Sequence, residues 1–145
     1  MVTGKVTCTR RLHFCAGHRV LRHEGKCANL HGHNYVVFIT AQADSLDEVG
    51  RVVDFSVLKE RIGTWIDLNW DHKFLLYSKD EDAIAAVKRV NADDATVLLP
   101  FNPTAENIAL HLLREVGPLL MQGTGVCLSS VVVHETENCS AEVSL

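Results

Sequence analysis

Two segments near the start of the chain alternate apolar with polar residues, as half-buried β-strands do. The alternation predicts strands over residues 6–16 and 32–44, joined by a polar loop. Within the second segment, residues 36–39 form the unbroken apolar run Val-Val-Phe-Ile. A strand that is apolar on both faces needs cover on both faces. We therefore expect packing on each side of this strand.

Two later segments repeat apolar residues at helical spacing. Asp54 can cap a helix that runs to about Ile66, with one apolar stripe made of Phe55, Leu58, Ile62, Trp65 and Ile66. Thr104 is the expected cap of a second helix, which Gly117-Pro118 ends or bends, and its buried face consists of Ala105, Ala109, Leu112, Leu113 and Val116. Both stripes predict helices that pack on the sheet.

The remaining segments complete the order strand, strand, helix, helix, strand, strand. Residues 77–94 indicate a surface insertion with a short helix at 82–89, and residues 96–101 form a short extended piece. Residues 129–136 and 141–143 flank a turn and predict a terminal hairpin. This order indicates the α+β class.

Composition limits what the protein can be. With 145 residues, of which 47% are hydrophobic and 22% charged, we expect one domain over residues 1–145. No apolar segment reaches the length of a membrane span, and no signal core is visible, so we expect a cytoplasmic protein without a membrane partner. The five cysteines are odd in number and form no Cys-x-x-Cys pair, which favours reduced thiols. The net charge of −4 argues against a nucleic-acid partner.

Histidines gather where the first two predicted strands meet. His31 and His33 lie two residues apart at the start of a strand, so both imidazoles can project to one face. His18 closes the preceding strand, and Gly17 before it permits close backbone approach. Three histidines without an obvious fourth ligand are typical of a catalytic zinc, which keeps one position open.

The spacing leaves alternatives to this ligand set. His13 and His23 compete with His18 for the third position. Cys27 could be a fourth ligand, and the site would then be closed and structural. The sequence pattern alone does not exclude that arrangement.

Other charged groups stand near predicted strand and helix ends. The first loop carries Arg19, Arg22, His23 and Lys26, which suit either phosphate binding or simple solvation.

Asp71-His72 lies on a predicted turn, where it could transfer protons near neutral pH or be solvated. Glu135 closes a Val-rich strand and could accept two parallel hydrogen bonds from a guanidine-like ligand edge. Glu106 could simply interact with the dipole of its own helix.

Together these motifs resemble the 6-pyruvoyltetrahydropterin synthase family over essentially the whole chain. The resemblance rests on Cys27-x3-His31-Gly-His33, with His18 upstream, on Asp71-His72, on Pro103-Thr104-Ala105-Glu106-Asn107 and on Glu135-Thr136. The three-residue gap between Cys27 and His31 is similar to that of the family's 6-carboxy-5,6,7,8-tetrahydropterin synthases, which serve queuosine biosynthesis. Trp70 before Asp71 and the long segment 77–94 depart from the commonest pattern.

The resemblance implies a tunnelling fold, with an antiparallel four-stranded sheet, two helices on one face, and trimers that close a barrel and pair into a homohexamer. It implies a zinc-dependent lyase acting on 7,8-dihydroneopterin triphosphate, or alternatively the pyruvoyl-forming enzyme that only eliminates triphosphate. A non-catalytic zinc- or pterin-binding module is a third hypothesis. The implied zinc ligands are His18, His31 and His33; the implied catalytic residues are Cys27, Asp71 and His72; and the implied pterin contacts are Glu135, Thr104 and Glu106.

Overall fold

A six-stranded sheet organises the fold, which a computed structural model describes for residues 5–145. The strands lie in the order β4-β3-β1-β2-β5-β6. Their bounds are β1 Thr7–His18, β2 His31–Gln42, β3 Lys73–Tyr77, β4 Thr96–Leu99, β5 Cys127–His134 and β6 Ser140–Ser144. The predicted α+β class is confirmed, and the two long strands begin and end within two residues of their predicted bounds.

Four of the strands form the predicted antiparallel sheet. β1 pairs with β2, β2 with β5, and β5 with β6, all antiparallel. The predicted count of four strands was nevertheless wrong for the whole sheet, because β3 and β4 extend it on the other side of β1, both in parallel. The terminal hairpin lies where the sequence predicted it.

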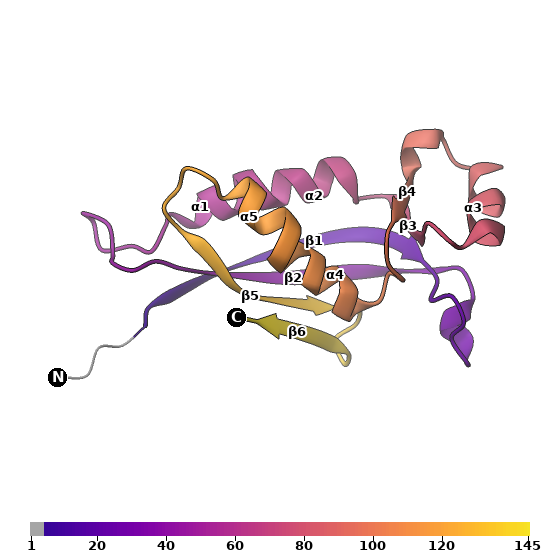
Figure 1. Cartoon of the computed structure of the whole chain (residues 1–145), viewed down its shortest axis with the longest axis horizontal. Coiled ribbons are helices and arrows are strands. Elements are labelled where there is room, and N and C mark those ends of the chain that lie inside the picture. Colours follow the sequence, from indigo (N-terminus) through magenta and orange to yellow (C-terminus); the bar gives the residue numbers. More distant parts are fainter. Residues whose placement is uncertain (1–4) are drawn as a thin grey trace.

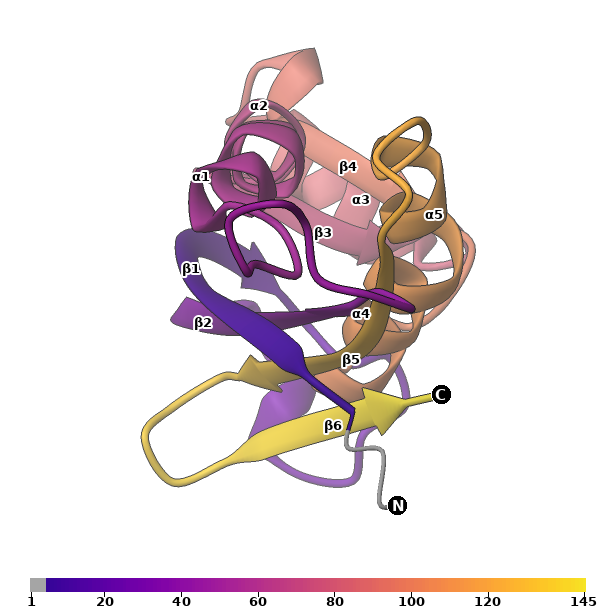
Figure 2. The same ribbon diagram turned by 90° about the vertical axis from the view of Figure 1, so that its left-hand side faces the viewer.

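Two long helical segments cover one face of this sheet (Figure 1, Figure 2). The first consists of α1 Phe55–Leu58, the π-helical turn η2 Lys59–Gly63 and α2 Thr64–Asn69. The second consists of α4 Ala105–His111, the π-helical turn η4 Leu112–Val116 and α5 Gly117–Leu120. The predicted caps are correct, since Asp54 accepts from the Ser56 N–H and Thr104 from the Asn107 N–H.

The second helix continues past Gly117-Pro118, where the sequence predicted an end or a bend. A side chain at Gly117 would place its Cβ 2.4 Å from the Leu128 side chain on β5, so glycine lets the helix approach the sheet closely. Pro118 lacks the N–H of an ordinary helical residue, and the wider π turn of η4 directly precedes it. Gly117-Pro118, the pair that predicted an end or a bend of the helix, therefore lies where the helix contacts β5 closely.

The core lies between the helices and the sheet. Phe14 of β1 stacks on Tyr35 of β2 with ring centroids 4.9 Å apart, and both side chains are fully buried beside Trp70. On the opposite face of the sheet, which we call the open face, β1 side chains are exposed while Val36 and Phe38 are half-buried. The helices of one chain cover one side of β2, so the predicted cover on its open face stays a prediction.

The segment after β3 carries its own small core. It contains α3 Glu81–Lys88 and η3 Asp93–Ala95 before β4 begins, close to the predicted surface insertion. Leu76, Ala83 and Val87 are buried together there, apart from the main core. The short helix η1 Lys26–Ala28 lies in the loop between β1 and β2. Among residues 5–145, no helix has the length and apolar character needed to cross a bilayer.

Candidate metal centre

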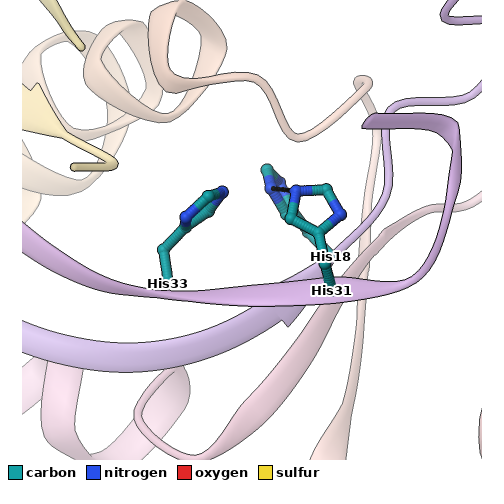
Figure 3. Close-up of side chains that lie close together, drawn as sticks. All are labelled: His18, His31 and His33. Carbon is teal, nitrogen blue, oxygen red and sulfur yellow. Dashed lines mark hydrogen bonds between the residues drawn. The ribbon is translucent and has the colours of Figure 1, made fainter. Parts of the chain in front are cut away.

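Three histidines meet on the face of the sheet that the helices cover. His18 ends β1 and lies opposite His31 in the antiparallel register, while His33 follows two residues along β2. Figure 3 shows all three rings projecting to the same side of the ribbon. Strand alternation and pairing explain this placement. His31 and His33 are separated by one residue of the other face, and His18 lies on the same face as its partner His31.

The ring nitrogens are close enough to share one ion. His18 Nε2 and His31 Nε2 are 3.1 Å apart, and one ligand atom from each of the three residues lies within 4.8 Å of the others. His33 Nε2 is buried and has no hydrogen-bond partner within the described chain. A buried ring nitrogen without a partner is costly. A metal ion between the three rings would satisfy it, so these residues fit a metal.

The outer ring nitrogens of two ligands are held by backbone carbonyls. His18 Nδ1 lies 2.8 Å from the Pro103 carbonyl oxygen and His31 Nδ1 lies 2.6 Å from that of Asn29, so each Nδ1–H can donate. The Tyr35 hydroxyl lies 3.1 Å from the same His18 nitrogen. Donation from Nδ1 leaves the Nε2 lone pair free for a metal and fixes the orientation of each ring.

Burial favours the neutral form of two of these imidazoles, those of His18 and His33. Burial lowers the pKa of His18 to about 4, although its hydrogen bond to Pro103 opposes that shift. Burial also lowers the pKa of His33, against the attraction of the Glu135 carboxylate. Since metal ligation needs the neutral ring, both shifts favour a metal at neutral pH.

Glu135 lies at the edge of this cluster. It follows β5 directly, and its Oε2 is 3.6 Å from His33 Nε2. Together they line a groove of about 700 Å³ that extends over Val36 and Phe38 on the open face. The sequence placed a carboxylate at the end of an apolar strand, and the structure adds that it borders the histidine cluster.

Cys27 lies in η1, in the loop that connects His18 to His31. Its carbonyl oxygen accepts from the Val20 N–H at 2.8 Å, and its side chain is half-buried. The group of described residues that could hold a metal consists of the three histidines and does not include Cys27. His13 is exposed and belongs to the alternate set of β1 side chains.

Asp71 and His72 form a hydrogen-bonded pair on the turn before β3. Asp71 Oδ2 lies 2.8 Å from His72 Nδ1, and Asp71 Oδ1 accepts from the Cys15 N–H at 2.9 Å. Burial opposes ionisation of Asp71, but these two hydrogen bonds outweigh it and lower the carboxyl pKa. His72 adopts a φ of 60° and its side chain is 79% exposed. It borders a hollow of about 540 Å³ whose lining includes His31 and His33 but not Cys27.

The two remaining predicted contacts lie at the start of α4. The Thr104 hydroxyl caps the helix by accepting from the Asn107 N–H at 3.1 Å. Glu106 is exposed in the first turn, which agrees with a simple interaction with the helix dipole. Pro103, one residue before the cap, supplies the carbonyl that holds His18. Thus α4 positions one ligand of the cluster.

One basic residue of the first loop is already paired. Arg19 donates from Nε to Asp80 Oδ2 at 2.6 Å and from Nη2 to Asp80 Oδ1, and Asp80 is buried. The hydrogen bonds from Arg19 lower the pKa of the Asp80 carboxyl against the effect of burial. Arg22 and Lys26 remain exposed. No local pattern in the sequence indicates this role of Asp80, because its partner Arg19 is 61 residues away.

A family model described as 6-pyruvoyl tetrahydropterin synthase matches residues 7–145. The chain belongs to this family. A relative from Rickettsia bellii, named 6-carboxy-5,6,7,8-tetrahydropterin synthase, is 41% identical over 138 residues, which cover 95% of this chain and 99% of the relative. A relative from Halobacterium salinarum, named probable 6-carboxy-5,6,7,8-tetrahydropterin synthase, is 36% identical over 91% of this chain and 82% of its own.

Solved structures of other proteins share the fold. An uncharacterised protein of Wolinella succinogenes superposes with a TM-score of 0.81 at 26% identity, over 98% of this chain and 99% of its own. The 6-pyruvoyl tetrahydropterin synthase of Caenorhabditis elegans superposes with a TM-score of 0.68 at 23% identity, over 97% and 96% of the two chains. The second likeness concerns the fold alone.

Proposed function

We propose that this family member is a zinc-dependent 6-carboxy-5,6,7,8-tetrahydropterin synthase. The reaction would convert 7,8-dihydroneopterin triphosphate and water to 6-carboxytetrahydropterin, acetaldehyde and triphosphate, a step of queuosine biosynthesis. The names of the full-length relatives support the product class. The observation that carries the proposal is the cluster of three histidines in which His33 Nε2 has no hydrogen-bond partner within the described chain.

His18, His31 and His33 would hold zinc, which these three nitrogen ligands suit and which would keep an open position. Bound there, zinc would act as a Lewis acid toward oxygen atoms of the substrate side chain and so acidify the adjacent C–H. Cys27 would remove that proton as a thiolate, and Asp71 with His72 would return protons to the side chain and the ring. No redox cofactor is needed, because unsaturation passes from the ring to the side chain within one molecule.

Glu135 would anchor the pterin. Its carboxylate can accept parallel hydrogen bonds from a ring N–H and the exocyclic amine, and it lies in the groove beside His33. That placement would hold the ring while its side chain reaches the metal. Thr104 and Glu106 would contact the substrate near the start of α4, although Thr104 already serves as the helix cap.

A homohexamer made of two trimers would complete the site. Two features of one chain support assembly: Cys27 is not among the residues lining the hollow of His72, and half-buried apolar side chains lie on the open face. Light scattering at micromolar concentration tests this proposal. A monomer would contradict it. We place the enzyme in the cytoplasm, since the described cysteines are all free thiols.

The product identifies the reaction. Purified protein loaded with zinc is incubated with 7,8-dihydroneopterin triphosphate, and the pterins are separated and weighed by mass spectrometry. We expect 6-carboxytetrahydropterin together with acetaldehyde. Accumulation of the 6-pyruvoyl compound without acetaldehyde would assign the alternative, triphosphate elimination alone. Binding of pterin without any turnover would refute both and indicate a binding module.

A further inference from the structure

The segment between β3 and β4 contacts the loop of residues 19–30 through one buried charge. Asp80 precedes α3, and its side chain is only 1% exposed. It accepts the two hydrogen bonds from Arg19 and also one from the Ala83 N–H at 3.3 Å, which caps α3. A carboxylate this deeply buried needs a cation and N–H donors to remain ionised. Asp80 has both.

Arg19 links this carboxylate to the turn that contains Cys27. Arg19 directly follows His18 of the three-histidine cluster. Its Nη1 lies 3.4 Å from the carbonyl oxygen of Ala28, the residue after Cys27. The next residue, Val20, donates to the Cys27 carbonyl oxygen at 2.8 Å. The two consecutive residues Arg19 and Val20 thus contact the adjacent carbonyl oxygens of Ala28 and Cys27.

The start of the same loop has a separate anchor. The Asn102 side chain accepts from the Leu21 N–H at 3.0 Å and donates to the Leu21 carbonyl at 2.9 Å. Asn102 shortly precedes α4, and its two hydrogen bonds to Leu21 do not involve Asp80. We expect them to remain in Asp80→Asn. Asp80 therefore joins the loop to the start of α3, whereas Asn102 joins it to the segment that precedes α4.

We propose that Arg19 and Asp80 form a positioning pair that fixes the Cys27 turn relative to the three-histidine cluster. The fork of a guanidinium bound by both carboxylate oxygens sets orientation as well as distance, which a single ion contact does not. The proposal rests on the proposed catalytic role of Cys27. It also gives the segment of α3 a function, namely to hold the carboxylate that orients Arg19, and it makes Arg19 unavailable to the substrate phosphates.

The test compares Asp80→Asn with Arg19→Lys and with a control. Asn keeps the cap of α3 but loses the charge, whereas Lys keeps the charge but loses the fork. Asp47→Asn is the matched control, because Asp47 forms an ion pair with Arg51 on the surface and neither residue belongs to the loop of residues 19–30. The readouts are zinc content, kcat and KM for 7,8-dihydroneopterin triphosphate, and hydrogen exchange of the peptide covering residues 19–30.

We expect Asp80→Asn to retain zinc, to raise KM by less than about threefold, and to lower kcat by about tenfold or more, since small displacements of a catalytic group are costly. Amide exchange of residues 19–30 should accelerate while residues 105–116 stay protected. Arg19→Lys should fall between the parent and Asp80→Asn, and Asp47→Asn should match the parent. Parent-like exchange of residues 19–30 in Asp80→Asn would overturn the proposal, as would loss of zinc with the loss of kcat.

Amide hydrogen exchange tests this inference separately from the proposed function. If the parent protein does not turn over the substrate, the proposed function fails, yet exchange of residues 19–30 still shows whether Asp80 holds the loop. If the parent is active and Asp80→Asn loses neither exchange protection nor kcat, the positioning pair alone is refuted.

Discussion

Removing the Tyr35 hydroxyl tests how His18 is held. Tyr35 is fully buried, and its hydroxyl lies 3.1 Å from His18 Nδ1, while the Pro103 carbonyl oxygen lies 2.8 Å from the same nitrogen. Phe in place of Tyr35 keeps the ring that stacks on Phe14. The change therefore removes one acceptor from His18 and leaves the ring packing intact.

The expected effect on zinc affinity is small. A single Nδ1–H cannot make two full hydrogen bonds, and the closer carbonyl remains after the substitution. A hydrogen bond contributes roughly 0.5–1.5 kcal/mol, which corresponds to a factor of about 2 to 12 in a dissociation constant. Loss of an outer partner usually weakens metal binding about 10- to 100-fold. We expect Tyr35→Phe to weaken zinc binding by about two- to tenfold, because Pro103 compensates.

Competition with a zinc-chelating dye at fixed pH measures this change. The matched control is Tyr77→Phe, since Tyr77 is the only other tyrosine of the chain and lies on β3, outside the cluster. Tyr77→Phe should bind zinc like the parent. A 100-fold loss in Tyr35→Phe would show that the hydroxyl, and not the carbonyl, holds His18. Parent affinity in Tyr35→Phe would show that the hydroxyl gives no support.

Four further changes probe the remaining parts. His31→Ala should lose most tightly bound zinc by metal analysis, and parent levels of zinc would refute the ligand set. Cys27→Ala should keep zinc and lose turnover by about 10²–10⁴-fold, whereas release of zinc would make Cys27 a ligand. Glu135→Gln should raise the Kd for the pterin in equilibrium binding and leave zinc content unchanged, and parent affinity would remove its anchoring role. Gly117→Ala should lower the thermal midpoint by forcing a shift against Leu128, despite the better helix propensity of Ala, and a raised midpoint would contradict this.

The cluster was predictable because its geometry follows from alternation along the strands. His31 and His33 share a face by their two-residue spacing, and the antiparallel register brings His18 opposite His31. Gly17 also has the predicted close approach, since the Phe74 ring occupies the space of its missing Cβ at 2.4 Å. Local pattern was therefore sufficient for His31 and His33, whereas His18 joins them through the pairing of β1 with β2.

The features that the sequence did not reveal depend on distant partners. β3 is a short apolar run that becomes a strand only by pairing in parallel with β1 and with β4, the extended piece predicted at residues 96–101. The continuation of the helix beyond Pro118 depends on how Gly117 meets β5. Asp80 gave no local signal, because Arg19 lies on the other side of two strands and a helix in the sequence.

The register of β1 and β2 limits where this chain can change length. Adding a single residue inside either strand would turn His18 or His31 to the other face and separate the ligands. The part of the connection between Leu21 and Asn29 carries no such restriction, because its length does not alter which strand residues are paired. Insertions and deletions there would leave the three imidazoles in place on their strands, so the length of this loop can change without altering the histidine cluster.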